Sequence, residues 1–258
     1  MIKLLFTLVL SSWSLGLYAA ASTSNVELGF YTSNITYTEP SVMEEKGSLS
    51  GVVAQIMSNK AGGISALDVL YSTGEMDYQG SGTIDDIPNE LFEIRGILGR
   101  EYMLDSGWKI ISYIGLGYRH LNDDSSGMVS STSAHGYERD QVYYYSPVGI
   151  HFIGEQFTSE WTFHGNIEFD YLILGRNNSY LSSVQGHEDL SFTQHDGYGS
   201  RFSLGLSKSV GKRVSLKLDL FYKYWDIEDS TIDYDYSTAM IEPENHSKEM
   251  GVILSLRI

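Results

Sequence analysis

The sequence predicts an all-β protein, a single closed up-and-down antiparallel barrel of about ten strands that crosses a membrane, with eight or twelve strands as alternatives. Three observations predict this fold. Stretches of about 10–14 residues alternate apolar and polar side chains, which is the period of a β-strand. The face opposite the apolar one carries acids and bases in near balance. The connections are alternately short and long, as expected when every strand crosses a bilayer.

Composition narrows the possible functions of the 258-residue chain. The absence of cysteine excludes disulfides, thiolate chemistry, cysteine-based zinc sites and lipidation at an N-terminal cysteine. A net charge of −16 argues against nucleic acid, because phosphate binding needs clustered Lys and Arg. No spacing typical of a cofactor or metal site is present, so we expect no cofactor and no metal.

The first residues predict a cleaved secretory signal over 1–21, which leaves 22–258 as the barrel domain. Lys3 supplies a short positive region, Leu4 to Leu17 is mostly apolar, and Ala19-Ala20-Ala21 supplies small residues for cleavage. Later apolar runs are too short to cross a bilayer as a helix, which needs about 20 residues. A protein integral to the membrane must then be a closed sheet, because lipid leaves no partner for unpaired backbone groups.

Ten alternating stretches define the expected strands. The last of them sets Met250, Val252 and Leu254 on one face and Glu249 and Ser255 on the other, and it should pair with the first strand to close the sheet. The sixth contains Pro147, which cannot donate to a ladder and predicts a bulge or a local break. The expected strands are 25–37, 48–58, 64–73, 89–102, 108–121, 142–153, 160–173, 197–208, 214–225 and 248–258.

The connections predict the orientation of the barrel. The joins after the second, fourth, sixth and eighth strands are short, and the others are longer and rich in Ser, Asp, Gly and Asn. With an even number of strands, both termini lie on the side of the short turns, which is the periplasmic side. We expect the long loops, above all 122–141, 175–195 and 226–247, to be extracellular and to present a binding surface.

The face opposite the apolar one is expected to fill the lumen with structural ion pairs, because an unpaired buried charge is expensive. A soluble sandwich or a lipocalin-like barrel would also alternate, but its water-exposed face has no need to balance charge. Tyrosines toward the strand ends agree with aromatic girdles at the membrane surfaces. The expected lumen charges are Glu93, Arg95, Arg119, Glu168, Asp170, Arg201, Lys217, Asp219, Glu249 and Arg257.

On this pattern the chain resembles the small β-barrel proteins of Gram-negative outer membranes, barrels of the size of the omptins. The resemblance covers essentially all of the mature sequence, and the stretches 224–230 and 241–245 are similar to such proteins. It implies a place in the bacterial outer membrane and no defined activity. One departure is the final residue, Ile258, where such barrels commonly end on an aromatic side chain read by the assembly machinery.

Candidate catalytic groups follow from the size that the chain shares with the omptin proteases, which act through acids and a His at the outer rim. Asp85 and Asp86 fall in the second long loop, and His195 with Asp196 begins the eighth strand. A His beside a carboxylate could orient water as a general base. Their spacing does not match the omptin pattern of paired acids, and charged loop residues are common, so the sequence favours solvated side chains.

The sequence therefore favours a non-enzymatic barrel with a filled polar lumen, in a structural or adhesin-like, surface-binding role. An omptin-like surface hydrolase and a narrow channel or small-ligand transport barrel remain the alternatives. The expected partners are outer-membrane lipid, lipopolysaccharide and the barrel-assembly machinery, with no nucleic acid and an undefined loop ligand. We expect a monomer. The acidic segment 226–235 could gather divalent cations, but it lacks the spacing of a calcium-binding loop.

Overall fold

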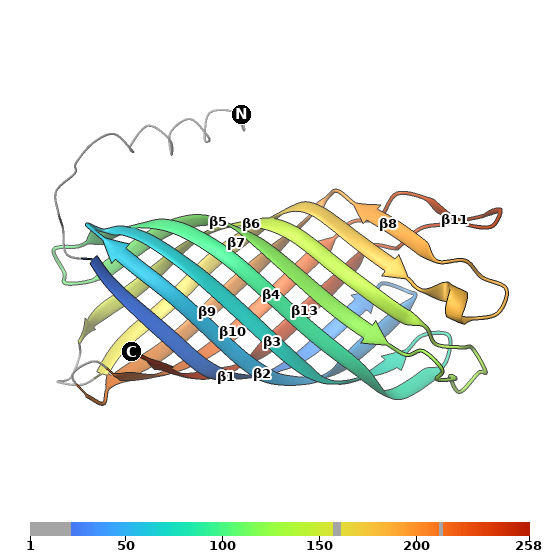
Figure 1. Cartoon of the computed structure of the whole chain (residues 1–258), viewed down its shortest axis with the longest axis horizontal. Helices are drawn as coiled ribbons and strands as arrows, with labels where there is room; N and C mark the ends of the chain where they lie inside the picture. Colours follow the sequence, from blue (N-terminus) through green and yellow to red (C-terminus); the bar gives the residue numbers. More distant parts are fainter. Residues whose placement is uncertain (1–21, 157–160, 212–213) are drawn as a thin grey trace.

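The computed structural model describes residues 22–156, 161–211 and 214–258, so the predicted signal and Glu160 lie outside the described residues. Long antiparallel strands wind around a single barrel (Figure 1). The ten that build its wall are β1 (Ser22–Glu39), β2 (Met43–Lys60), β3 (Gly63–Gln79), β4 (Thr83–Met103), β5 (Lys109–Asp124), β6 (Glu138–Gln156), β7 (Trp161–Ser179), β9 (Gly197–Ser209), β10 (Ser215–Ile227) and β13 (Asn245–Arg257). The short elements are η1 (Leu181–Ser183), β8 (Leu190–Gln194), β11 (Asp233–Asp235) and β12 (Thr238–Met240).

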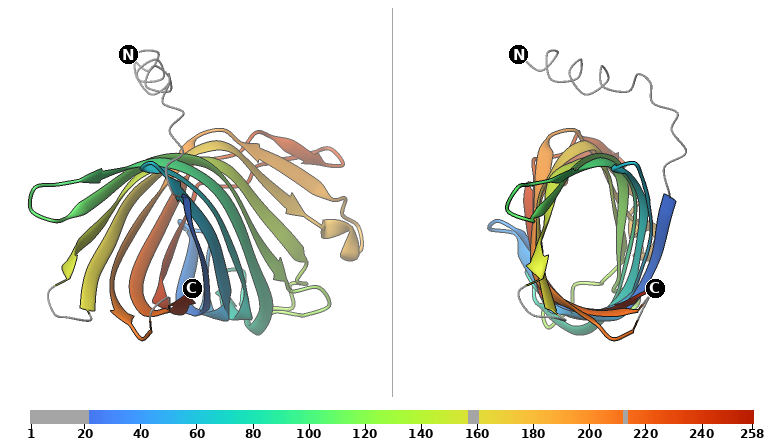
Figure 2. Two further views of the ribbon diagram at one scale, coloured as in Figure 1. Left: turned by 60° about the vertical axis from the view of Figure 1, so that its left-hand side comes forward. Right: turned by 90° about the vertical axis from the view of Figure 1, so that its left-hand side faces the viewer.

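The sheet closes between its first and last strands, as the sequence predicts. β13 pairs antiparallel with β1, where Phe30 lies opposite Leu254, and with β10, where Leu218 lies opposite the same residue. The pairing of β6 with β7 completes the ring, which Figure 2 shows in its right-hand view. The predicted all-β, up-and-down barrel is confirmed. Among the described residues, no helix is long and apolar enough to cross a membrane.

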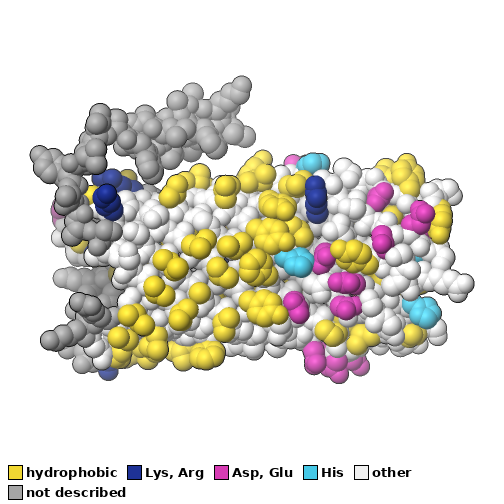
Figure 3. Space-filling view, viewed as in Figure 1, with side chains coloured by type: hydrophobic (Ala, Val, Ile, Leu, Met, Phe, Trp, Pro, Cys, Tyr) yellow, Lys and Arg dark blue, Asp and Glu magenta, His cyan; other side chains and the backbone are white. Residues whose placement is uncertain are grey.

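The outer wall is apolar over the part of the barrel nearest the chain termini. Phe30 is 74% exposed, Leu116 67% and Leu220 59%, and exposed apolar side chains recur on every wall strand. Figure 3 shows them gathered on one face of this part of the barrel. Lipid is the solvent that suits such a surface, because exposing so much apolar area to water would cost a large free energy. The alternation predicted from the sequence places this face outward and the charged face inward.

Farther from the termini the same strands reverse their polarity. Along β1, Asn34 and Thr36 face outward, whereas Ile35 and Tyr37 are buried inside. The interior here is a hydrophobic core, which also includes Leu49, Met76, Leu91 and Leu121. The barrel therefore continues beyond the lipid as a water-exposed barrel with an ordinary apolar core. In Figure 3 the acidic side chains gather over this part.

The strands continue past this reversal, so several of them extend beyond the ends that the single apolar face predicts. The first two long loops are mostly extended hairpins, with turns at 40–42 and 80–82. Asp85 and Asp86 consequently lie on β4, at a bulge opposite Asp77, where Asp86 takes a φ of 57°. The three predicted loops 122–141, 175–195 and 226–247 remain irregular over part of their length. Short strands form within the last two of them, β8 in one and β11 and β12 in the other.

The predicted irregularity at Pro147 is present, although β6 runs through it. Pairing of β6 with β5 stops at Val148 opposite Ile114 and resumes at Tyr145 opposite Gly117. On the other side, the register with β7 shifts between Tyr144 and Tyr145. Proline has no backbone N–H to donate, so a gap in one ladder is the expected way to keep it in a wall strand.

Candidate functional site

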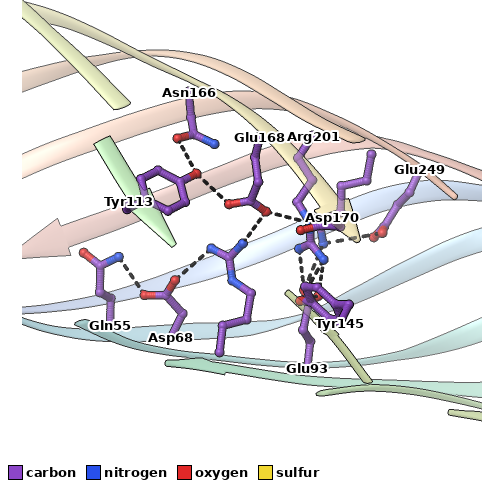
Figure 4. Close-up of polar contacts among 12 residues, drawn as sticks. Gln55, Asp68, Glu93, Tyr113, Tyr145, Asn166, Glu168, Asp170, Arg201 and Glu249 are labelled. Atoms are coloured by element: carbon purple, nitrogen blue, oxygen red, sulfur yellow. Dashed lines mark hydrogen bonds and ion pairs between the residues drawn. The ribbon is translucent and has the colours of Figure 1, made fainter. Parts of the chain in front are cut away.

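A network of buried ion pairs inside the barrel is centred on Arg201 of β9 (Figure 4). Its guanidinium donates from Nη1 to Glu93 Oε2 at 2.8 Å and from Nε to Asp170 Oδ2 at 2.6 Å, and Nη2 also bonds Glu93. Tyr145 adds its hydroxyl, which donates to Glu93 Oε1 at 2.5 Å. These residues come from β4, β6, β7 and β9, so the network ties opposite walls together.

A second arginine, Arg95 of β4, continues the network toward the periplasmic end. It donates to Asp68 Oδ2 and to Glu168 Oε1, each at 2.7 Å. Tyr113 donates its hydroxyl to Glu168 Oε2 at 2.5 Å, and Gln55 donates to Asp68 at 2.8 Å (Figure 4). A guanidinium presents several donors in one plane, which suits a crowded site with carboxylates on two sides.

The seam between β1 and β13 carries its own cluster. Glu27 accepts a hydrogen bond from Lys217 Nζ at 2.8 Å, from Ser255 Oγ at 2.7 Å and from Arg257 Nη2 at 3.0 Å. Three strands, β1, β10 and β13, meet through this single carboxylate. Asp219 of β10 lies close by, where its Oδ1 is 2.7 Å from His164 Nε2.

The ten charges predicted for the lumen are all placed on the inner wall. Glu249 is buried, with its Oε2 3.5 Å from Lys223 Nζ, and Arg119 stacks its guanidinium on the Tyr143 ring at 5.6 Å. The network leaves an interior packed with side chains, in keeping with the size of a ten-stranded ring. That these charges serve structure alone stays a prediction.

A further cluster, which the sequence did not single out, lies in the part of the barrel beyond the lipid. Arg139 of β6 donates to Glu45 Oε1 at 2.8 Å, to Asp123 Oδ2 at 2.8 Å and to Glu39 Oε1 at 3.2 Å. Next to it, Glu242 accepts from Tyr37 at 3.3 Å. Burial, followed by the neighbouring Glu39, raises the pKa of Glu242 to about 8.

The candidate catalytic residues do not come together in the structure. Asp85 and Asp86 are exposed on β4, while His195 and Asp196 are exposed between β8 and β9. Within the described part of the chain, no hydrogen bond or ion pair joins the two groups. The Asp86 backbone N–H is held by Asp77 Oδ1 at 3.1 Å, and the Asp196 carbonyl accepts from the Glu228 N–H at 3.0 Å. Neither contact arranges a general base, and the hydrolytic role stays a prediction.

The connection between β10 and β13 carries an ordered hairpin, β11–β12, with exposed apolar and aromatic side chains. Ile232 is 58% exposed, Tyr234 56% and Tyr236 65%. The hairpin is fixed to the β8 region, because Asp233 accepts from the Ser191 N–H at 2.7 Å and Asp235 Oδ2 lies 2.6 Å from His187 Nδ1. Its acidic side chains therefore hold the loop in shape while the apolar ones point to solvent.

Comparisons with known proteins identify the fold. No model of a protein family matches the chain, and no curated protein sequence matches it. Among solved structures, it is similar to the outer membrane protease OmpT from Escherichia coli, with a TM-score of 0.61 and 7% identity over 95% of this chain and 99% of that one. The fold is that of an outer-membrane β-barrel.

A second solved structure, the translocator domain of the autotransporter NalP from Neisseria meningitidis, aligns over 98% of this chain and 95% of its own at 13% identity and a TM-score of 0.46. The fold and the apolar outer belt agree with the predicted place in the bacterial outer membrane. In that setting the ends with short turns face the periplasm, and the hairpin and the Arg139 cluster face the cell exterior.

Proposed function

We propose that this barrel is a surface-binding protein of the outer membrane, adhesin-like in role, whose extracellular loops contact a protein partner. The observation that carries the proposal is the β11–β12 hairpin. Three neighbouring large side chains, Ile232, Tyr234 and Tyr236, are more than half exposed there. Aromatic side chains that are held rigidly and left open to water are typical of the centres of protein interfaces.

Charge indicates the kind of partner. The segment 226–247 contains no Lys or Arg, and its acids are Asp226, Glu228, Asp229, Asp233, Asp235, Glu242 and Glu244. An apolar centre with an acidic surround is complementary to a basic surface that carries apolar residues of its own. Such charge would speed association and would make binding sensitive to salt.

The interior supports a binding role over transport. Arg201 and Arg95 each hold carboxylates from more than one wall strand, and these ion pairs across the mid-lumen support a filled interior. A filled interior is typical of barrels of this size, whereas aqueous pores belong to about 16 strands and more. Bound lipid, lipopolysaccharide and the assembly machinery remain expected partners, and a monomer remains the expected state.

The test is retention of the refolded barrel on immobilised proteins that differ in charge. We expect binding to basic proteins that weakens as salt is raised, and little binding to acidic ones. Serine at 232, 234 and 236 together should remove most of the retention, because it deletes the apolar centre and keeps the acids. The matched control is Val129→Ser, which removes an exposed apolar residue from a different loop. Equal retention of the triple variant and the wild type would contradict the proposal.

The two alternatives have their own readouts. A surface hydrolase would cleave peptides in a panel, and His195→Ala would abolish the cleavage. A channel would show discrete conductance in planar bilayers. Either result would replace the surface-binding role, since neither activity is expected from an exposed hairpin over a filled lumen.

A further inference from the structure

Two cations lie side by side on the outer wall near the periplasmic end of the barrel. Lys60 ends β2 and Arg100 lies on β4, and both are register partners of one residue, Gly63 of β3. Both side chains are exposed. Neighbouring strands are about 4.8 Å apart, so the two backbones are about 10 Å apart and both long side chains can reach a group held between them. Gly63 has no side chain to fill this gap. We call Lys60 and Arg100 the basic patch.

The turn that follows Lys60 is fixed to β4 beside Arg100. The Gly62 N–H donates to Asn59 Oδ1 at 3.0 Å, and the Gly62 carbonyl accepts from the Glu101 N–H at 2.7 Å. The Arg100 side chain lies next to this turn, because a Cβ atom at Gly62 would be 3.9 Å from its Nε. Ordered backbone therefore holds the two cations of the basic patch near each other.

The basic patch differs from other charged groups at this end of the barrel. Arg257 lies 3.0 Å from Glu27, and Lys109 lies 3.8 Å from Glu101, so these two cations already have anionic partners. Among the described residues, neither cation of the basic patch forms an ion pair with a carboxylate. Both are thus available to an anion that comes from outside the chain.

The wall around the basic patch changes from hydroxyl-bearing to apolar side chains. Ser112 lies opposite Arg100, and Ser65 lies opposite Leu98, and both serines are exposed. Toward the middle of the barrel the exposed residues are those of the apolar belt, Ile56, Leu67 and Leu98. Long basic side chains at the edge of such a belt place their charges at the level of lipid headgroups while their stems lie on apolar surface.

The opposite boundary of the belt carries acids. Asp226 accepts hydrogen bonds from Tyr198 at 3.2 Å and from Tyr224 at 3.3 Å, and Asp140 accepts one from Tyr180 at 2.9 Å. In Figure 3 the acidic side chains gather over the part far from the termini, and most of the visible Lys and Arg side chains lie at the other end. An anionic headgroup is repelled at the first boundary and attracted at the second, so charge favours the periplasmic leaflet.

We propose that the basic patch binds the phosphate of an anionic glycerophospholipid in the periplasmic leaflet. Lys60 and Arg100 would donate to the phosphate oxygens, and the acyl chains would lie along Leu98 and the belt beside it. A zwitterionic lipid carries a cationic group of its own, which two nearby cations would repel. The site is separate from the β11–β12 hairpin and would exist whether or not the loops bind a protein.

The experiment is native mass spectrometry of the refolded full chain in detergent, titrated with phosphatidylglycerol and with phosphatidylcholine of the same acyl chains. We expect tighter binding of phosphatidylglycerol. Lys60→Gln or Arg100→Gln should weaken it by about 5-fold, and both together by about 30-fold, with phosphatidylcholine unchanged. The matched control is Lys46→Gln, which removes an exposed cation at the far end of the same strand, where it already lies 3.5 Å from Glu44. Affinity should not change there.

A charge-preserving variant separates charge from folding. Arg100→Lys should keep most of the affinity for phosphatidylglycerol, and every variant should keep the heat-dependent gel mobility of the wild type, because both positions are exposed. Equal affinity in the double variant and the wild type would overturn the proposal, and so would equal binding of the two lipids by the wild type. Glycerol 3-phosphate has no acyl chains and should not displace the lipid. Displacement at equal concentration would indicate a site for soluble phosphates instead and would also overturn the proposal.

Discussion

Replacement of Arg201 by Met is the sharpest test of the lumen network. The substitution keeps an unbranched apolar stem and removes a guanidinium that lies within hydrogen-bond reach of Glu93 and Asp170. Glu93 would keep Lys223, whose Nζ is 3.7 Å away. Asp170 has Arg201 as its one basic partner among the described residues, and its Oδ1 is already without a donor. Removing one partner of a buried pair costs about 3–5 kcal/mol.

The measurement is the free energy of unfolding in urea, followed by the difference in gel mobility between folded and unfolded barrel. We expect Arg201→Met to lose about 3–5 kcal/mol. The double variant Arg201→Met with Asp170→Asn should recover part of that loss, because no bare carboxylate remains. An interaction energy of about 0.5–3 kcal/mol between the two changes would be typical of direct contact. A loss below about 1 kcal/mol, or strictly additive effects, would refute the idea that these charges are held as buried pairs.

Three further predictions follow from other parts of the wall. Leu254→Arg, on the lipid face of β13, should cost about 2–4 kcal/mol of unfolding free energy, whereas Leu254→Met should be nearly neutral. Glu27→Gln should cost about 3–5 kcal/mol by leaving Lys217 and Arg257 without their shared anion; an unchanged urea midpoint would contradict this. The raised pKa of Glu242 favours its protonated form in the folded barrel, so this contribution to stability is present at low pH and is lost as pH rises through about 8. The measurement is the urea midpoint of unfolding across this pH range. Glu242→Gln should make the midpoint fall less as pH rises, whereas Glu244→Gln, at an exposed neighbouring position, should leave the fall unchanged.

The sequence predicts the membrane part of this barrel well, for a physical reason. Within the lipid, outward residues must be apolar and inward ones can be polar, so β7 alternates from Ile167 to Ile173 and β10 from Leu216 to Phe221. The pairing of β13 with β1 follows from the even count and the need to remove edges. Lumen charges such as Asp170 and Asp219 follow from the same alternation, because each lies between two exposed apolar positions.

What the sequence does not predict is the part beyond the lipid. There the outward positions are polar and the inward ones apolar. A strand predicted from one continuous apolar face therefore ends where the polarity reverses. β1 and β2 are therefore longer than expected, and Arg139 lies on a strand where a loop is expected. A signal does exist: Ile35, Tyr37 and Leu49 continue the two-residue period with the opposite phase. Two partners of Arg139, Glu39 and Glu45, lie 100 and 94 residues away along the chain, and no local pattern connects them to it.

The reversal of polarity along each strand also fixes how deeply the barrel is immersed. A vertical shift of two residues, about 6–7 Å along a strand, would place Asn34 or Ser48 in hydrocarbon at one boundary and expose belt residues to water at the other. A barrel whose outer surface stayed apolar beyond the bilayer would tolerate such sliding. This one has a single favoured depth, and a thicker bilayer must thin around it. The height at which the β11–β12 hairpin stands above the surface is consequently a property of the sequence.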